Sequence, residues 1–189
     1  MKPKLLYIVN NYSFGAIPKI LNLIIPNFIN SFTIKIISLE KILNNHFLNQ
    51  LDKNIEFISL NMHRLNIFGS IISLKTEIDK FSPDIIHSNL GRADIYSAIC
   101  KPSNCKLITT VHTRSKIEFS RGLFNITQII FKLLDCRFNH KVFISKIVQD
   151  SWNNKCHKKI GTIIYNPVAI KQISNTKNHQ KKPFKILFV

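Results

Sequence analysis

Short, continuous apolar runs alternate along the chain with longer stretches in which apolar residues recur every three or four positions. The first pattern is typical of strands buried on both faces, and the second of amphipathic helices. The strand-like runs cover residues 5–9, 32–39, 55–60, 84–87, 106–111, 141–144 and 162–165. The helix-like stretches cover residues 15–25, 40–51, 67–81, 92–100, 123–134 and 145–152. Strands that alternate with helices in this order predict parallel βαβ units.

Two of the helical stretches carry an apolar stripe that we expect to face the core. In the first stretch the stripe consists of Ile67, Phe68, Ile71, Ile72, Ile78 and Phe81. In the second it consists of Leu123, Ile126, Ile129, Ile130, Leu133 and Leu134. The predicted fold class is therefore α/β, with a doubly wound, mainly parallel, Rossmann-like sheet.

The composition of the chain changes near its end. Residues 1–170 are predicted to form one domain, and the polar, basic stretch 171–183 is interpreted as a linker. Residues 184–189 form another strand-like run. We interpret that run as the first strand of a second domain that the chain lacks, so the chain is expected to be truncated.

The charge of the chain restricts its partners more than its fold. Its 189 residues include 27 Lys and Arg against 10 Asp and Glu, a net charge of +17. Nucleic acid, an anionic membrane surface and phosphorylated substrates all fit this charge, although abundant Lys, Asn, Ile and Phe are also typical of an AT-rich genome. The cations that we expect to favour an anionic membrane are Lys155, Lys158, Lys159, Lys181 and Lys182.

No segment of the sequence predicts a membrane span or a metal site. The apolar run at the N-terminus stops at Asn10, too early for a signal peptide. The longest apolar stretch, residues 17–29, contains two prolines and two asparagines. The four cysteines lack metal-ligand spacing and are expected to be free thiols. We therefore expect a cytoplasmic protein without a metal or other cofactor, one that could lie peripherally on the inner face of the membrane.

The carboxyl ends of the predicted strands collect the candidate site residues, because ligands of open parallel sheets bind there. These residues are Ser13, Gly15, Ala16, Asn89, Arg92, His112, Arg114 and Ser145. Gly15 suits an anion at a helix N-terminus, but a glycine at a strand-to-helix turn is more often only a turn residue. His112 fits a hydrogen-bond donor, a general base or a structural histidine. His87, preceded by Ile85 and Ile86, is expected to be structural.

Several segments together resemble the N-terminal domain of family 4 glycosyltransferases of the GT-B fold. The glycine turn of that family corresponds to Ser13-Phe14-Gly15-Ala16, with Ala16 at the position of its second glycine. The other matching segments are residues 83–94 (PDIIHSNLGRAD), 107–112 (LITTVH), 140–145 (HKVFIS), 163–169 (IIYNPVA) and 186–189 (ILFV). The resemblance covers nearly the whole chain, in the order that the family shows.

The resemblance implies one half of a GT-B enzyme, the half that mainly holds the acceptor. The enzyme would be a retaining transferase that moves a hexosyl group from a nucleotide-sugar to a lipid-linked, polysaccharide or lipopolysaccharide acceptor of the cell envelope. His112 would be catalytic, and Ser13, Gly15, Ala16, Asn89, Arg92, Arg114 and Ser145 would bind substrate. The nucleotide-sugar would be a co-substrate, and a second domain or partner chain would complete the cleft.

Two alternatives remain open at this point. The chain could be a non-catalytic binding domain that needs a partner chain, or a basic α/β domain that binds nucleic acid. Phenylalanines lie mainly within apolar stripes, so no base-stacking platform is evident and no specific nucleic acid is expected.

Overall fold

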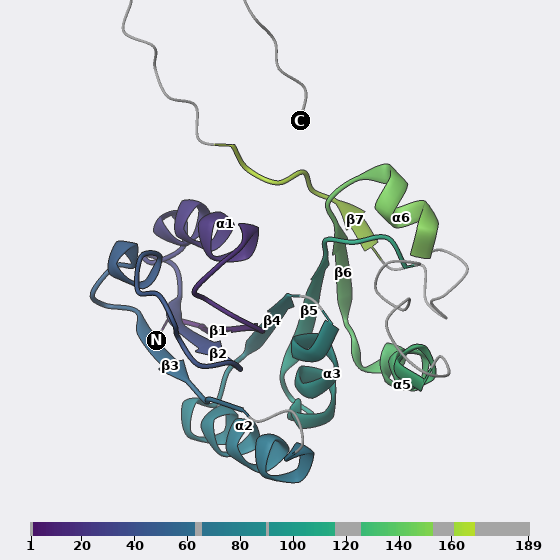
Figure 1. Ribbon diagram of the computed structural model, residues 1–189, viewed down its shortest axis with the longest axis horizontal. Coiled ribbons are helices and arrows are strands. Elements are labelled where there is room, and N and C mark those ends of the chain that lie inside the picture. Colours follow the sequence, from purple (N-terminus) through teal and green to yellow (C-terminus); the bar gives the residue numbers. More distant parts are fainter. Residues whose placement is uncertain (1, 63–65, 90, 116–125, 153–160, 169–189) are drawn as a thin grey trace, which may run out of the picture.

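The computed structural model describes residues 2–62, 66–89, 91–115, 126–152 and 161–168. Within them, seven strands form one sheet in the order β3-β2-β1-β4-β5-β6-β7, and every neighbouring pair is parallel (Figure 1). The strands are β1 (Lys4–Val9), β2 (Thr33–Ser38), β3 (Glu56–Ser59), β4 (Ile85–Asn89), β5 (Lys106–Val111), β6 (His140–Phe143) and β7 (Gly161–Ile163). The prediction of a doubly wound, parallel α/β fold is confirmed.

Five α-helices and three 3₁₀ turns are described between these strands. The helices are α1 (Ala16–Ile24), α2 (Ile67–Phe81), α3 (Gly91–Cys100), α5 (Ile126–Leu134) and α6 (Lys146–Trp152). The turns are η1 (Ile25–Asn27), η2 (Leu48–Gln50) and η3 (Asp135–Arg137). The predicted linker 171–183 and the predicted strand 184–189 lie outside the described residues.

Different helices cover the two faces of the sheet. Leu6 and Ile8 of β1 join a core cluster with buried side chains of α2, α3, α5 and α6. The alternate β1 side chains, Leu5, Tyr7 and Val9, join a second cluster beneath α1. Along the chain, β2 and β3 extend the sheet on one side of β1, and β4 to β7 then extend it on the other side. Because right-handed crossovers in opposite directions place their helices on opposite faces, this order produces the two layers.

The helix predicted over residues 40–51 is wrong. The structure has an irregular segment there that contains only the short turn η2. The Ser13 hydroxyl accepts the backbone N–H groups of Leu43 and Asn44, at 2.8 and 3.3 Å, and the Asn44 side chain accepts the N–H of His46. These side-chain bonds compete with the helical hydrogen bonds of the backbone, as short polar side chains often do.

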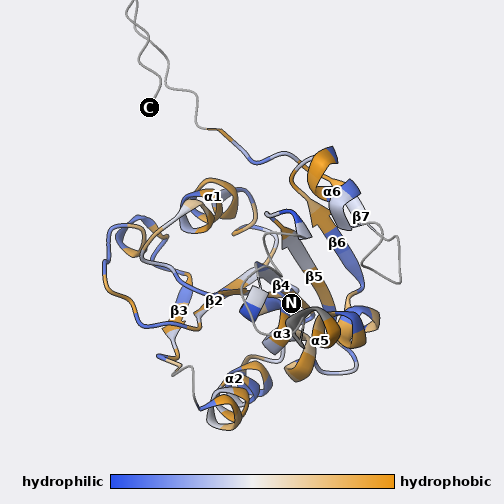
Figure 2. Cartoon of the chain, turned by 45° about the vertical axis from the view of Figure 1, so that its right-hand side comes forward, coloured by the Kyte–Doolittle hydropathy of each residue, from blue (hydrophilic) through white to orange (hydrophobic). Residues whose placement is uncertain are grey.

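The predicted apolar stripes of α2 and α5 are only partly confirmed. Helix α2 buries Ser70, Leu74, Ile78 and Phe81, whereas Ile67, Phe68 and Ile72 are exposed. Helix α5 buries Phe131 and exposes Ile129, Ile130 and Leu133. Apolar residues therefore lie on more than one side of both helices (Figure 2). A repeat of three or four alone does not show which of two apolar sides faces the sheet.

Candidate functional site

The order of the strands changes direction between β1 and β4, and the candidate site lies at the carboxyl ends of these strands. Asn10 follows β1, Asn89 ends β4, and His112 follows β5. The Asn10 side-chain oxygen accepts the backbone N–H of Ala93 at 2.9 Å. This bond holds the first turn of α3 against the end of β1.

A buried carboxylate fixes the ends of β4 and β5 relative to each other. Asp94, in the first turn of α3, accepts hydrogen bonds from the hydroxyls of Ser88 and Thr109, at 2.6 and 2.7 Å. All three side chains are buried. Both distances are at the short end of the range for hydroxyl donors. The residues next to Ser88 and Thr109 in the sequence, which face the other side of the sheet, are therefore held in a fixed register.

The loop after β1 forms the turn that the sequence predicts around Gly15. Asn11 accepts the backbone N–H groups of Ser13 and Phe14, at 2.6 and 3.3 Å. Gly15 has φ 98° and precedes α1 as its N-cap, a conformation that side chains with a Cβ rarely adopt. Gly15 and Ala16 are both exposed, so the helix N-terminus faces solvent.

Ser13, which was predicted to bind substrate, is buried instead, and its hydroxyl holds the loop after β2. The structure therefore gives Ser13 a structural contact, and its role toward a substrate stays a prediction.

Four polar side chains form two matched hydrogen bonds on the face of the sheet that carries α1. Nε2 of His112 lies 3.2 Å from the side-chain oxygen of Asn89, and Nε2 of His87 lies 2.8 Å from the hydroxyl oxygen of Thr110. Each bond joins a residue of β4 to the residue 23 positions later, at or just beyond the end of β5. His87 also packs against the ring of Tyr7, with centroids 5.2 Å apart. His112 is half-buried and Asn89 is buried.

Both histidines are neutral at ordinary pH. Burial lowers the pKa of His112 from 6.5 to about 4. Burial, and then the nearby charge that His112 would carry, lowers the pKa of His87 to about 4. A neutral imidazole has one N–H and one free lone pair, so each ring can donate once and accept once.

These lowered pKa values predict that acid destabilises the domain. In the unfolded chain the histidines bind protons near pH 6.5, whereas in the folded chain they do so only near pH 4. The free energy of unfolding should therefore fall as pH decreases from 6.5 to 4, by about 1.4 kcal/mol for each unit of pKa shift. Urea unfolding at several pH values measures this dependence.

The variant His87→Gln should make that dependence shallower, because it removes one of the two groups. The variant His46→Gln, at an exposed position, is the matched control and should leave it unchanged. A wild-type slope in His87→Gln would contradict the assignment of a half-buried, neutral imidazole at this position.

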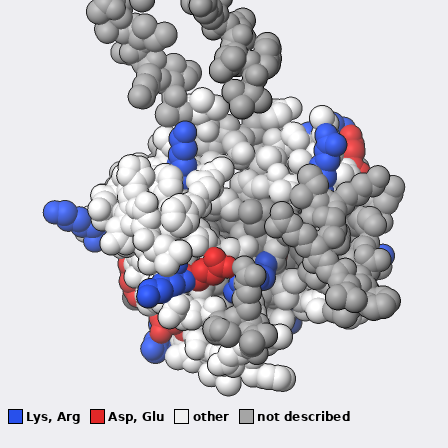
Figure 3. All heavy atoms as spheres, viewed as in Figure 1, with Lys and Arg blue, Asp and Glu red and all other residues white. Residues whose placement is uncertain are grey.

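The cation predicted at Arg92 is matched by an acid that sequence analysis did not include in the site. Arg92 donates from Nη1 to Glu40 at 3.0 Å, and Asn11 donates its amide N–H to the same carboxylate at 3.2 Å. Glu40 lies 52 positions from Arg92, so only the fold brings them together. On the face seen in Figure 3, acidic side chains lie beside several of the basic ones. The high net charge of the chain therefore does not produce a uniformly basic surface at this edge.

The other predicted residues lie farther along the edge. Arg114 is exposed, and Ser145 is half-buried and caps α6 by accepting the N–H of Val148 at 3.3 Å. The structure therefore gives Ser145 a helix-capping contact, and its role toward a substrate stays a prediction. The cations Lys155, Lys158, Lys159, Lys181 and Lys182 lie outside the described residues.

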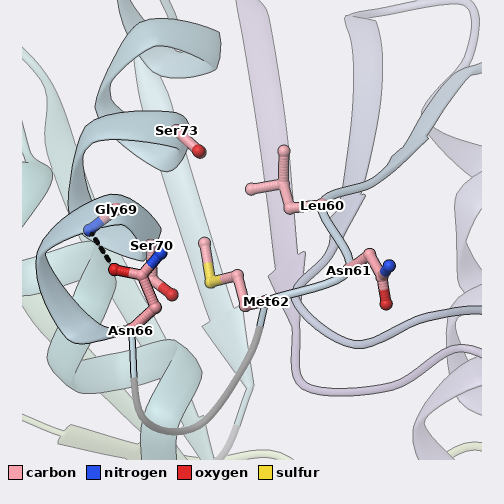
Figure 4. A pocket seen from close by; sticks show the side chains of 7 residues that line it. All are labelled: Leu60, Asn61, Met62, Asn66, Gly69, Ser70 and Ser73. Carbon is pink, nitrogen blue, oxygen red and sulfur yellow. Dashed lines mark hydrogen bonds between the residues drawn. The ribbon is translucent and has the colours of Figure 1, made fainter.

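A small pocket lies outside this group of residues, between the start of α2 and the segment after β3 (Figure 4). It has a volume of about 220 Å³, and its lining residues are Leu60, Asn61, Met62, Asn66, Gly69, Ser70 and Ser73. Asn66 caps α2 by accepting the N–H of Gly69 at 3.0 Å. The predicted site residues are not among those that line this pocket.

Neither a metal site nor a membrane span is found in the part of the chain that the structure describes. Its His, Cys, Asp and Glu side chains form no group of three or more that could hold a metal ion. None of its helices has the length and apolar content needed to cross a membrane.

Comparison with known proteins decides the family of the chain. The family model of glycosyltransferase family 4 matches residues 43–172, more than half of the chain. The chain belongs to glycosyltransferase family 4. The match includes Asn89, Arg92, His112, Arg114 and Ser145 but not the turn around Gly15. No curated protein matches the sequence.

Solved structures share the fold of this family 4 chain at low sequence identity. HepE of Anabaena, solved with UDP and glucose, is 14% identical, with a TM-score of 0.64; the match covers 87% of this chain and 45% of HepE. The lipopolysaccharide outer core galactosyltransferase WaaB is also 14% identical (TM-score 0.65; 95% of this chain, 50% of WaaB). The UDP-GlcNAc 2-epimerase of Methanocaldococcus jannaschii is 14% identical (TM-score 0.62; 86% of this chain, 45% of the epimerase).

These structures show that the family 4 chain has the fold of one half of a GT-B protein. The chain spans half or less of the length of each of the three. Because the neighbours include an epimerase, the fold alone does not determine the reaction. The family match is the finding that points to glycosyl transfer.

Proposed function

We propose that this chain is the acceptor half of a glycosyltransferase that moves a sugar from a nucleotide-sugar to an acceptor with retention of configuration. The observation that carries the proposal is the position of His112. Its neutral imidazole lies at the strand ends beside the change in strand direction, within the segment matched to glycosyltransferase family 4. Small-molecule sites of open α/β sheets occur at this position.

The donor that we propose is a UDP-sugar, bound mainly by a second GT-B domain that faces this edge. HepE was solved with UDP-glucose, and WaaB is a galactosyltransferase of the lipopolysaccharide outer core. By analogy with these two proteins, we propose a hexosyl donor and a lipopolysaccharide, polysaccharide or lipid-linked acceptor. The open N-terminus of α1 at Gly15 would approach the diphosphate, since helix N-termini attract anions.

The proposed site residues have two kinds of role: contact with the reacting part of the donor, and binding or orientation of the substrates. His112 would hydrogen-bond to the reacting part of the donor, and Asn89 would lie behind it. Arg92 is already matched by Glu40, so we propose that this pair orients substrate hydroxyls rather than supplying a free positive charge. Arg114 is exposed and would reach the acceptor. No metal or other cofactor is proposed for this half.

The test of this proposal is a transfer assay on an enzyme that joins this chain to a second GT-B domain. The joined enzyme should release UDP from a UDP-sugar only when an acceptor is present, and the chain alone should release none. Salt-sensitive binding of the chain to DNA of arbitrary sequence, without any UDP release by the joined enzyme, would instead favour a nucleic-acid-binding function.

A further inference from the structure

We propose that Asn89 is a positioning residue for His112. Its side-chain oxygen accepts the Nε2–H of the imidazole and thereby keeps the lone pair on Nδ1 free to meet a substrate. The proposal rests on the proposed function in one respect, namely that His112 is the group that contacts the substrate. The placement of the proton on His112 can be measured independently of any sugar transfer.

The geometry of the contact supports a positioning role. Oδ1 of Asn89 lies 3.2 Å from Nε2 of His112. Asn89 is only 4% exposed, so the protein rather than solvent determines the orientation of its side chain. Its strand is held on the other face by the hydrogen bonds of Asp94 to Ser88 and Thr109. A side chain on so fixed a backbone can hold an imidazole in one orientation.

The amide of Asn89 also has a feature that packing alone does not explain. Its side-chain nitrogen is buried and makes no hydrogen bond to the described residues. Buried polar groups without a partner destabilise a fold, and in native proteins they are uncommon outside sites with another purpose. An apolar residue would avoid this cost. The contact with His112 is what the amide supplies that an apolar residue would not.

The proton position determines which substrate group His112 can contact. A neutral imidazole with its proton on Nε2 presents only an acceptor at Nδ1. Such an acceptor pairs with a hydroxyl and not with a phosphate oxygen, because phosphate oxygens are acceptors as well. The sequence left donor and base roles for His112 open. The contact with Asn89 favours the acceptor role, toward a hydroxyl-bearing part of the substrate.

The experiment is to record nitrogen NMR spectra of the imidazole rings at neutral pH on the ¹⁵N-labelled chain of 189 residues. A His112→Gln spectrum assigns the His112 signals. In the wild type, Nε2 of His112 should have the shift of a protonated ring nitrogen and Nδ1 that of an unprotonated one. Asn89→Leu, which keeps the branched shape without the oxygen, should lose this single pattern. Asn89→Asp, which keeps an oxygen acceptor, should retain the proton on Nε2.

The equivalent bond of His87 provides a matched control. Thr110→Val removes the hydroxyl bonded to His87 and should change the His87 pattern while leaving that of His112 unchanged. A wild-type His112 with its proton on Nδ1, or an unchanged pattern in Asn89→Leu, would overturn the proposal. If Asn89→Leu does not fold, the wild-type and Asn89→Asp spectra still show whether the proton of His112 lies on Nε2. The spectra contain no donor or acceptor, so a failure of sugar transfer would not affect them.

Discussion

Replacing His112 with alanine should lower the turnover of the joined enzyme about 100-fold, which corresponds to about 2.7 kcal/mol of lost transition-state stabilisation. The expectation follows from the position of the imidazole at the strand ends and from its neutral state. Donor affinity should change much less, because we place most donor contacts in the second domain. Initial rates at saturating UDP-sugar, together with the Kd of the donor, measure the two effects separately.

The matched control for this experiment is His140→Ala. His140 begins β6 and bonds to the Thr162 hydroxyl at 2.9 Å, so it lies at the opposite end of a strand from the candidate site. This variant should keep nearly the wild-type turnover. Near-normal turnover in His112→Ala, with a thermal melt like that of the wild type, would remove the catalytic assignment. The chain would then be an acceptor-binding scaffold.

The largest effect on stability is expected from Lys141→Met. The Lys141 ammonium pairs with Asp135, and both side chains are almost fully buried, at 3% and 0% exposure. It also lies 5.9 Å from the centre of the Phe138 ring. Removing one member of a buried ion pair costs about 3–5 kcal/mol, because the other charge stays buried and loses its ion-pair partner. For a chain of this size, that loss lowers Tm by about 6–20 °C.

Two further variants test the cause of this loss. Lys146→Met removes a lysine from an exposed pair with Asp150 and should cost less than about 1 kcal/mol. The double variant Lys141→Met with Asp135→Leu removes both buried charges and should recover much of the stability. The explanation by charge burial would be wrong if Lys141→Met were as mild as Lys146→Met. Calorimetric melts of the four proteins provide the comparison.

The sequence was sufficient to predict the elements that local patterns determine. The strands β1 and β5 are continuous apolar or β-branched runs, and such runs are distinctive in a parallel sheet. The segment 40–51 was mispredicted because its apolar spacing suits a helix, whereas Ser13, about 30 positions away, binds its backbone N–H groups. That contact exists only after the sheet has brought β1 and β2 together.

The candidate site shows the same limit. The placement of Asn89 and His112 near one another followed from the rule for strand ends, and the structure brings their side chains into contact. The pairing of Arg92 with Glu40 could not be predicted, because Arg92 lies in the first turn of α3, Glu40 lies in the segment after β2, and no local pattern links them. Likewise, burial decides the protonation of His112, and burial depends on the packing of the whole edge.

The configuration of the first-formed product tests the central claim most directly. The enzyme that joins this chain to a second GT-B domain would be given a UDP-sugar and an acceptor, and the anomeric proton of the new glycoside would be followed by NMR. We expect the donor's own anomeric configuration in the product, and no product from either half alone. A product of inverted configuration, or one formed by the chain without the second domain, would contradict the account.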